Sequence, residues 1–437
     1  MCRLARPRIG VRILPAGSGP RPGRGGGTPA AGPSPADLRP PTRQPRPGNL
    51  PRPRPLQKQY PALTRALEAS TPPAVRSIIA NLNERGRGRA GYTGFARRHL
   101  ELEIGQRRLP GLRALPPLTS ERSASQITEQ LTPEHVGEIA SSTIRSLTGT
   151  RPPADLKARI QKQNAEAPRA LGARAVVQGA RTPTPQLPKF DWRDKGWIVR
   201  HSGIVTAAKD QSRPGNCGCC WAFASIGTVE AAYARSNLVL IGGSEQYLLN
   251  CTAPLLAAAG TTGVPYSCDG GWWAFDVLTT KVTPRGVPTA AALNYVAVQG
   301  PPNTNFPLPY KLERWGYVST GQNPNEIPTA EELKQALCEF GPLAAAVNVF
   351  DPNAWYLYNG DGSIQDFPDD PQRSVNHAIM IVGWDDTRDN GQGAWVIKNS
   401  WGEDWGQQGF GFVRYGHNNI GFGAAWVVPS GLAAQGD

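Results

Sequence analysis

The sequence predicts an α+β fold of two lobes for residues 187–437. Two observations lead to this fold class. Helical patterns dominate the first half of this module, and after Tyr310 short runs of β-forming residues follow one another, separated by Gly- and Asp-rich turns. Separate helical and strand-rich halves are typical of α+β proteins. A chain of 437 residues is long enough for this module and for a large N-terminal region besides.

The N-terminal head has a composition that opposes folding. Residues 1–55 contain fourteen prolines and eleven arginines, with almost no aliphatic pattern. Such a segment cannot bury enough apolar surface to offset the entropy lost on ordering, so we expect disorder. Residues 1–186 carry 31 Lys and Arg against 11 Asp and Glu, whereas residues 187–437 carry 16 against 23. The basic charge therefore belongs to the N-terminal part, where a solvated Arg-rich tail explains it and nucleic-acid binding is the alternative.

The region between the head and the module changes character once more. Residues 56–147 should be partly helical, because apolar residues recur every three or four positions in 63–82 and in 127–147. Residues 148–186 return to Pro, Arg, Gly and Gln, which predicts a linker.

The module opens near Leu187, and its first half should be helical. Helices are expected over 220–235, over 244–251 with Ser244 as N-cap, and over 272–280. In the second half, Thr329-Ala-Glu-Glu332 is a capping box that predicts a helix ending near Phe340. The β-rich runs then predict four strands, over 343–349, 378–382, 394–397 and 410–415.

Four polar residues could supply the chemistry of thiol-catalysed peptide hydrolysis. Cys220 stands where a Gly-containing turn enters a helix, and the free N–H groups of a helix N-terminus favour a thiolate. His377, at the start of an apolar run, could act as the base. The amide of Asn399 could accept from the ring N–H, and the amide of Gln211 could donate to an oxyanion. Each residue alone has an ordinary structural explanation, so the hypothesis depends on the four together.

The cysteine count agrees with a free nucleophile. Seven cysteines leave at least one thiol unpaired. Zinc binding by Cys217, Cys219 and Cys220 is the rival interpretation, but no second Cys or His pair follows at ligand spacing. We therefore expect no metal and no cofactor.

The motifs around these residues resemble those of the papain-like cysteine proteases, of the papain and cathepsin type. The resemblance extends over about residues 187–427. It rests on Leu187-Pro188 with Asp191-Trp-Arg193, Gln211 with Cys217-Gly-Cys-Cys-Trp221, Ser244–Cys251, Cys268-Asp-Gly-Gly271, and Asn399-Ser-Trp-Gly-Glu-Asp-Trp-Gly406.

This resemblance implies a helical left lobe, a β-barrel-like right lobe and a cleft between them. It implies that Cys220 is the nucleophile and that His377 is the general acid and base. Asn399 would orient the imidazole, and Gln211 would complete the oxyanion hole.

The resemblance also implies a set of supporting residues. Trp401 and Trp405 would shelter the imidazole, and Cys217 would form a disulfide with Cys268. The substrate would lie against Gly270, Gly271, Trp272, Trp273 and Trp401. The two adjacent tryptophans would form the pocket for the side chain two residues before the scissile bond, with an apolar preference.

Several positions depart from the family pattern. Cys219 stands where Ser or Ala is usual. The loop from Gln211 to the nucleophile carries extra residues, Arg213-Pro-Gly215 among them. Cys220 and His377 are 157 residues apart, against a usual separation of roughly 130–150. Cys251 has no evident disulfide partner.

The resulting hypothesis is a cysteine-type endopeptidase that works through an acyl-enzyme and is made as a zymogen. Residues 56–147 would be the prosegment and would inhibit the chain's own cleft, although the interlocking motif usual in family prosegments is not found in them. The expected partners are protein or peptide substrates, and we expect a monomer without membrane contact. A catalytically silent papain-like binding module is the alternative, and acyl transfer would share the same nucleophile.

Two features of the sequence bear on the cellular location of the protein. The N-terminus shows no secretory apolar stretch, since the run from Ile9 to Leu14 is short and interrupted by Arg12. The predicted disulfide favours an extracytoplasmic or secreted location.

Overall fold

The computed structural model describes residues 95–96, 99, 133–167, 183–195, 197, 203–321 and 327–431. The chain divides into Met1–Pro53 and Arg54–Asp437, and every described residue belongs to the second unit. The predicted disordered head and the helical pattern of residues 63–82 lie outside the described residues. No helix in the described ranges combines the length and apolar character that crossing a membrane requires.

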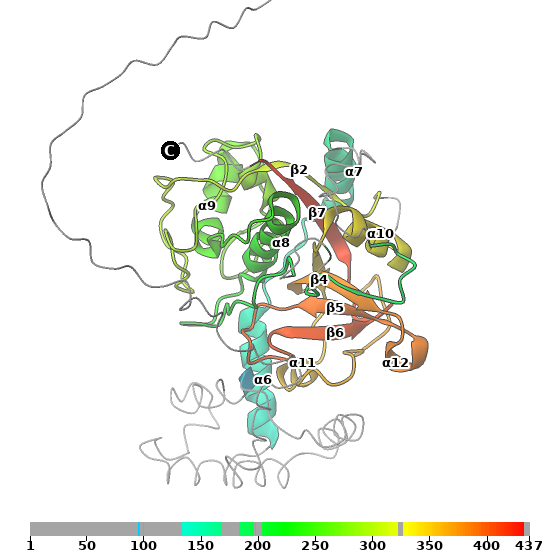
Figure 1. Cartoon of the computed structure of the whole chain (residues 1–437). Helices are drawn as coiled ribbons and strands as arrows, with labels where there is room; N and C mark the ends of the chain where they lie inside the picture. Colours follow the sequence, from blue (N-terminus) through cyan, green and yellow to red (C-terminus); the bar gives the residue numbers. More distant parts are fainter. Residues whose placement is uncertain are drawn as a thin grey trace, which may run out of the picture. The chain divides into compact units, whose positions relative to one another are not determined.

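Along the described chain, most helices come before every strand except the first, and three more helices lie between the later strands (Figure 1). The helices are α6 (Pro133–Leu147), α7 (Leu156–Glu166), α8 (Cys220–Asn237), α9 (Glu245–Ala258), the 3-10 helix η3 (Phe275–Leu278), α10 (Ala330–Phe340), α11 (Pro352–Tyr356) and α12 (Arg388–Gly391). The strands are β1 (Lys189–Asp191), β2 (Leu312–Tyr317), β3 (Leu343–Val347), β4 (His377–Asp385), β5 (Ala394–Lys398), β6 (Phe410–Arg414) and β7 (Phe422–Pro429).

The strands form one antiparallel sheet in the order β2-β7-β3-β4-β5-β6, and β1 pairs with β4. In Figure 1, the green helices α8 and α9 lie beside this sheet rather than within it. The α+β fold class is confirmed.

Helix α8 lies where the helical part meets the sheet. Every one of its residues from Cys220 to Ala234 is buried. A Cβ atom on Gly227 would lie 2.4 Å from the sulfur of Met380, so only glycine lets α8 approach β4 this closely. Cys220, the start of α8, is seven residues before Gly227, which is about 10 Å along a helix that rises 1.5 Å per residue. His377, the start of β4, is three residues before Met380, which is also about 10 Å along a strand that rises about 3.3 Å per residue. Both starts therefore lie about 10 Å from this contact, and the interaction of Cys220 with His377 shows that the two starts lie at the same end.

The predicted helix caps are present. The Ser244 side chain accepts a hydrogen bond from the backbone N–H of Tyr247. Thr329 and Glu332 form both bonds of the capping box at the start of α10. The predicted helix over 272–280 is reduced to η3, because the indoles of Trp272 and Trp273 are anchored to separate partners before η3 begins.

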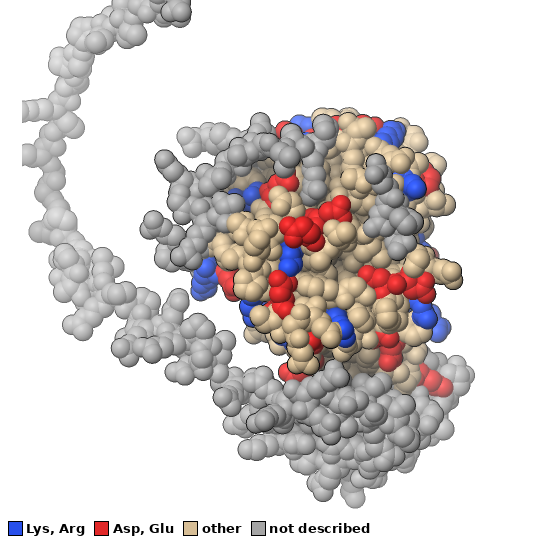
Figure 2. Space-filling model, turned by 90° about the vertical axis from the view of Figure 1, so that its right-hand side faces the viewer, with Lys and Arg blue, Asp and Glu red and all other residues tan. Residues whose placement is uncertain are grey.

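A buried network of charges joins the two lobes. Lys209 contacts Glu230 on α8 and Glu245 on α9, both at 2.6 Å. Thr206 donates to Glu230 at 2.8 Å and accepts from Lys398 on β5 at 2.8 Å. On the outside, Figure 2 shows acidic side chains gathered on one face with basic ones scattered among them, in keeping with the acidic balance of residues 187–437.

Candidate active site

The structure brings Cys220, His377 and Asn399 together in one buried group. Cys220 is the first residue of α8, His377 is the first residue of β4, and Asn399 directly follows β5. The His377 Nε2 atom lies 2.8 Å from the Oδ1 atom of Asn399. Since Nε2 is engaged by the amide, the other ring nitrogen, Nδ1, is the one left for the Cys220 thiol, and the imidazole lowers the pKa of that thiol.

The two adjacent thiols differ in acidity. Burial would raise the pKa of Cys220, but the charge of the His377 imidazole, its hydrogen bond, and hydrogen bonds from Thr150 and Gly149 outweigh burial and lower the pKa to about 7. Burial raises the pKa of Cys219 strongly, despite a bond of 3.1 Å to the hydroxyl of Tyr295. A thiolate near neutral pH is therefore expected on Cys220 alone.

Aromatic rings enclose the imidazole. The ring of Trp401 lies 4.7 Å from that of His377, and Trp405 stands nearly perpendicular to Trp401 at 5.7 Å. Trp355, which the sequence analysis did not identify, lies 6.3 Å from His377. The ring of Phe95 stacks on that of Trp401 at 5.4 Å. These rings shield the His–Asn hydrogen bond from water.

Gln211 reaches the start of α8 in spite of the longer loop. Its side chain is fully buried, and its Nε2 atom donates to the carbonyl of Cys217 at 2.7 Å and to that of Leu147 at 2.9 Å. Its Oε1 atom accepts from the hydroxyl of Ser400 at 2.6 Å, which fixes the amide orientation. The amide donor thus already binds a carbonyl oxygen beside the nucleophile.

The chain itself lies across the nucleophile, and the residues nearest the sulfur come from the predicted linker rather than from residues 56–147. The backbone N–H of Gly149 and the hydroxyl of Thr150 each lie 3.4 Å from the Cys220 sulfur. Both residues belong to the stretch 148–186, which the composition predicted to be a linker and which also contains α7. The apolar pair Leu156 and Ile160, one helical turn apart and both buried, was the available signal for α7.

Gly270 and Gly271 form the wall against which this segment pairs. The N–H of Gly271 donates to the carbonyl of Gly149, and the N–H of Arg151 donates to the carbonyl of Gly271, both at 2.8 Å. A Cβ atom on Gly271 would lie 2.5 Å from the ring of Trp221, and one on Gly270 would lie 2.4 Å from Arg151. Glycine at both positions keeps the wall open to a backbone.

A disulfide connects this wall to the nucleophile. Cys217 and Cys268 are bonded, and the N–H of Gly218 donates to the carbonyl of Cys268 at 2.9 Å. Cys251 and Cys338 are both free thiols.

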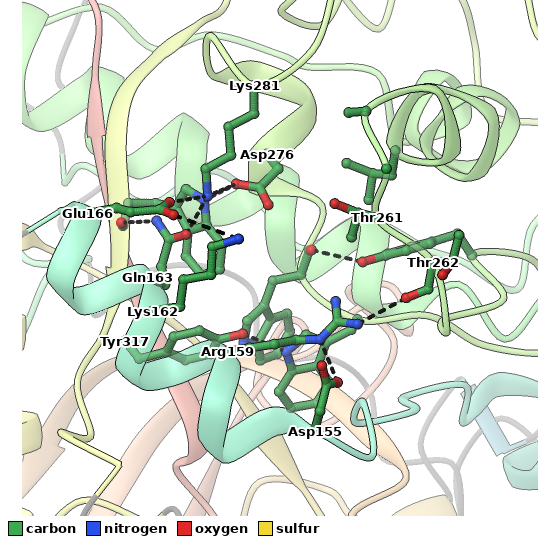
Figure 3. A pocket seen from close by; sticks show the side chains of 17 residues that line it. Asp155, Arg159, Lys162, Gln163, Glu166, Thr261, Thr262, Asp276, Lys281 and Tyr317 are labelled. Atoms are coloured by element: carbon green, nitrogen blue, oxygen red, sulfur yellow. Dashed lines mark hydrogen bonds and ion pairs between the residues drawn. The ribbon is translucent and has the colours of Figure 1, made fainter.

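Trp272 and Trp273 lie further along the same wall. Trp272 donates to the hydroxyl of Tyr317 at 3.0 Å, and Trp273 donates to the carbonyl of Gly423 at 2.7 Å. Both rings line a cavity of about 590 Å³ whose opposite side is formed by α7. Figure 3 shows this cavity with the charged side chains of α7 directed into it.

Comparisons with known proteins identify the family of the chain. The family described as "Papain family cysteine protease" matches residues 187–429. Digestive cysteine proteinase 2 of Homarus americanus is 28% identical over 267 residues, which are 60% of this chain and 72% of the relative. Cathepsin L1 of Drosophila melanogaster is 30% identical over 249 residues, which are 56% of this chain and 58% of the relative. The solved digestive procathepsin L2 proteinase from Tenebrio molitor larval midgut aligns with a TM-score of 0.49 at 26% identity, over 76% of this chain and 92% of that chain. Because the family model matches more than half of the chain, the chain belongs to the papain family of cysteine proteases, a family of hydrolases.

Proposed function

We propose that the chain is an endopeptidase that hydrolyses peptide bonds through Cys220, His377 and Asn399. The single observation that carries this proposal is the buried group of Cys220, His377 and Asn399, in which Nε2 of His377 lies 2.8 Å from Oδ1 of Asn399 and the imidazole lowers the pKa of Cys220 to about 7. A thiolate and an imidazolium at one site are the two partners that acyl transfer to sulfur needs.

The steps follow from the positions of the atoms. The Cys220 thiolate attacks the carbonyl carbon, and the oxyanion accepts hydrogen bonds from the Cys220 backbone N–H and the Gln211 amide. His377 protonates the leaving amine, which departs and leaves a thioester on Cys220. Water, deprotonated by His377, attacks the thioester and releases the acid, which restores the thiolate and the imidazolium. Asn399 holds the ring throughout.

An internal cleavage site is favoured by the path of the chain itself. The segment from Leu147 to Arg151 passes the sulfur, with partners on both sides of it: Gln211 on one side and Gly271 on the other. A groove that accommodates a continuous chain on both sides of the nucleophile suits an endopeptidase.

The test is cleavage of an internally quenched peptide that is blocked at both ends. We expect cleavage after activation of the full chain, and complete loss in Cys220→Ala. Cys219→Ala is the matched control, because it removes the neighbouring thiol, which stays protonated, and should leave the activity in place. If a peptide is cut only when one of its termini is free, the enzyme is an exopeptidase. An activity that survives Cys220→Ala would overturn the proposal.

We further infer that the N-terminal part is an inhibitory prosegment that includes α6, the segment over Cys220 and α7. The N–H of Gly149, rather than a carbonyl carbon, faces the sulfur, so the segment occupies the site without presenting a bond to cut. Processing is expected near residues 184–189, between α7 and β1, and it should stop in Cys220→Ala. Unchanged processing of that variant would exclude autocatalysis.

The silent binding module remains the rival function, and labelling separates the two. Cys220 is fully buried under the prosegment, so iodoacetamide at pH 5–6 should label it slowly in the full chain and stoichiometrically after processing. A processed protein whose Cys220 reacts no faster than an ordinary thiol would be a silent relative. The disulfide, together with a relative named as a digestive proteinase, supports an extracytoplasmic or secreted location.

A further inference from the structure

Strand β2 is the edge of the sheet, and α7 covers its free side. Alternate backbone groups of β2 point to β7, as the bond from the N–H of Val318 to the carbonyl of Ala424 shows. The carbonyl of Trp315, the N–H of Tyr317 and, just past the strand, the carbonyl of Ser319 point the other way, toward α7, whereas the carbonyl of Tyr317 accepts from the indole of Trp426 on β7. An edge of this kind needs other partners or binds another chain.

Gln163 of α7 supplies the first of these partners. Its Nε2 atom donates to the carbonyl of Trp315 at 2.7 Å, and its Oε1 atom accepts from the ammonium group of Lys281 at 2.6 Å. The Gln163 residue is only 7% exposed, so its amide is almost fully enclosed. Figure 3 shows Lys281 directed at Gln163 and Glu166 from the opposite side of the cavity.

Asn164 supplies the next two partners. Its Oδ1 atom accepts from the backbone N–H of Tyr317 at 2.9 Å, and its Nδ2 atom donates to the carbonyl of Ser319 at 2.7 Å. Two side-chain carboxamides therefore bind three edge groups and one lysine. A carboxamide offers the same N–H and C=O groups as a peptide unit. The side chains of Gln163 and Asn164 therefore make the hydrogen bonds to β2 that the backbone of a neighbouring strand would make.

We propose that, once the prosegment has left, the edge of β2 together with Lys281 is a distal subsite that binds the upstream part of a peptide substrate as an added strand. The proposal rests on the proposed function, since it assigns a further contact to the same cleft. Adding an extended peptide to a free sheet edge is a general mode of peptide recognition.

The continuity of the cavity identifies the occupant as substrate. Trp272 and Trp273, the predicted pocket for the residue two before the scissile bond, line the same cavity as α7, Trp315 and Tyr317. The indole of Trp272 touches the hydroxyl of Tyr317 at 3.0 Å, so no gap separates the cleft from β2. Substrate residues further upstream run in this direction.

The length of α7 sets the reach of the subsite. From Leu156 to Gln163 the helix advances by about 10 Å at 1.5 Å per residue, a distance that an extended chain covers with about three residues. The subsite should therefore take residues about five to seven positions before the scissile bond. A peptide that starts four positions before it should be too short.

The first experiment compares two internally quenched peptides on the enzyme obtained by activating the full chain. Both share residues from four before to three after the scissile bond, and one is extended upstream by four residues. We expect kcat/KM to be about 5–10-fold higher for the extended peptide, as one or two net hydrogen bonds imply. N-methylation of single amides in the extension should abolish this ratio at one or two positions only. Lys281→Met should lower the ratio, and the exposed Lys195→Met, matched in chemistry, should not.

Equal rates for the two peptides, or an advantage that is insensitive to N-methylation, would overturn the inference and leave the proposed function standing. A failure of the proposed function appears differently, as a short peptide that is not cut at all.

A second measurement needs no catalysis. Hydrogen–deuterium exchange of the Tyr317 amide is followed in full-chain Cys220→Ala and in the same variant after active wild-type enzyme has cut off its prosegment and has then been removed together with it. Exchange should be faster in the processed variant, from which α7 has left, and should slow again when the extended peptide is added, but not when the short peptide is added. If the extended peptide leaves the exchange rate of the Tyr317 amide unchanged, only water replaces α7 at this edge and the inference is wrong.

Discussion

Cys219 and Cys220 are neighbours with the same side chain and the same burial, yet their surroundings give them opposite properties. Burial raises the pKa of both thiols. Only Cys220 has a cationic partner, the imidazole of His377, whose attraction exceeds the cost of desolvation. The second thiol is bound to Tyr295 and stays protonated, so the departure from the usual Ser or Ala does not add a competing nucleophile.

The first prediction concerns this thiolate. Absorbance at 240 nm, which reports thiolate, should titrate in the full chain with a midpoint near pH 7, because the pKa of Cys220 is lowered to about 7. His377→Ala removes the cause of the lowering and leaves burial, so the neutral-pH step should vanish. The other three free thiols among the described residues have raised pKa values and should not contribute, and Cys2, which lies outside those residues, is replaced by Ser in every sample. A midpoint near 7 that persists in His377→Ala would contradict the ion pair.

The second prediction concerns Asn399 as a positioning residue. Asn399→Ala removes the oxygen that lies 2.8 Å from Nε2 of His377, and a hydrogen bond to a charged group is worth roughly 1.5–3 kcal/mol. We expect kcat to fall about 10–100-fold with little change in KM, and the thiolate midpoint to rise. The exposed Asn294→Ala is the control. A fall in kcat without a change in the midpoint would indicate a structural role instead.

At the scale of the elements, local signals were sufficient for some and insufficient for others. The capping box of α10 and the N-cap of α9 are local motifs of four residues each, and both helices begin at the positions that these motifs predict. The strands β1, β2 and β7 were not predicted, because they depend on long-range pairing. β2, Leu-Glu-Arg-Trp-Gly-Tyr, shows no apolar alternation and is held by β7 and α7.

The segment over the nucleophile could not be predicted for a related reason. Gly149 and Thr150 find their partners at Cys220, Gly271 and Asn376, all at least seventy residues away. Composition describes such a stretch as a linker, whereas the site residues could be located because their flanking motifs are local.

The third prediction tests a cap. Thr329→Ala removes the side-chain oxygen that accepts from the N–H of Glu332, which should lower the free energy of unfolding by about 1 kcal/mol. Thr280→Ala, on an exposed residue outside the helices, should change it by less than about 0.5 kcal/mol. Urea denaturation followed by circular dichroism measures both, and equal effects would rule out the capping box as the cause.

At the scale of the whole molecule, the buried charges at Lys209, Glu230, Glu245 and Lys398 tie the helical lobe to the sheet. Burial lowers the pKa of Lys398 to about 8, while the unfolded chain keeps the ordinary value of 10.5. Between these two values the unfolded state binds a proton that the folded state lacks. The contribution of Lys398 to stability therefore rises with pH across this window and is constant below pH 8.

The fourth prediction uses this window. The free energy of unfolding of the wild type minus that of Lys398→Met should increase between pH 8 and pH 10, by at most about 3 kcal/mol. Lys195→Met, at an exposed site, should show no such trend in urea denaturation. A difference that falls with pH would mean that the ammonium group is stabilised by the network rather than penalised by burial.

The segment over Cys220 and the enzyme are parts of one polypeptide, so this connection determines how inhibition of the active site ends. While the connection is intact, the local concentration of the segment at the cleft is of the order of millimolar, whatever the protein concentration. A single cut between α7 and β1 replaces this by the real concentration in solution. Dilution alone can then open the site, so a crowded compartment would retain the block after cleavage and a spacious one would release it.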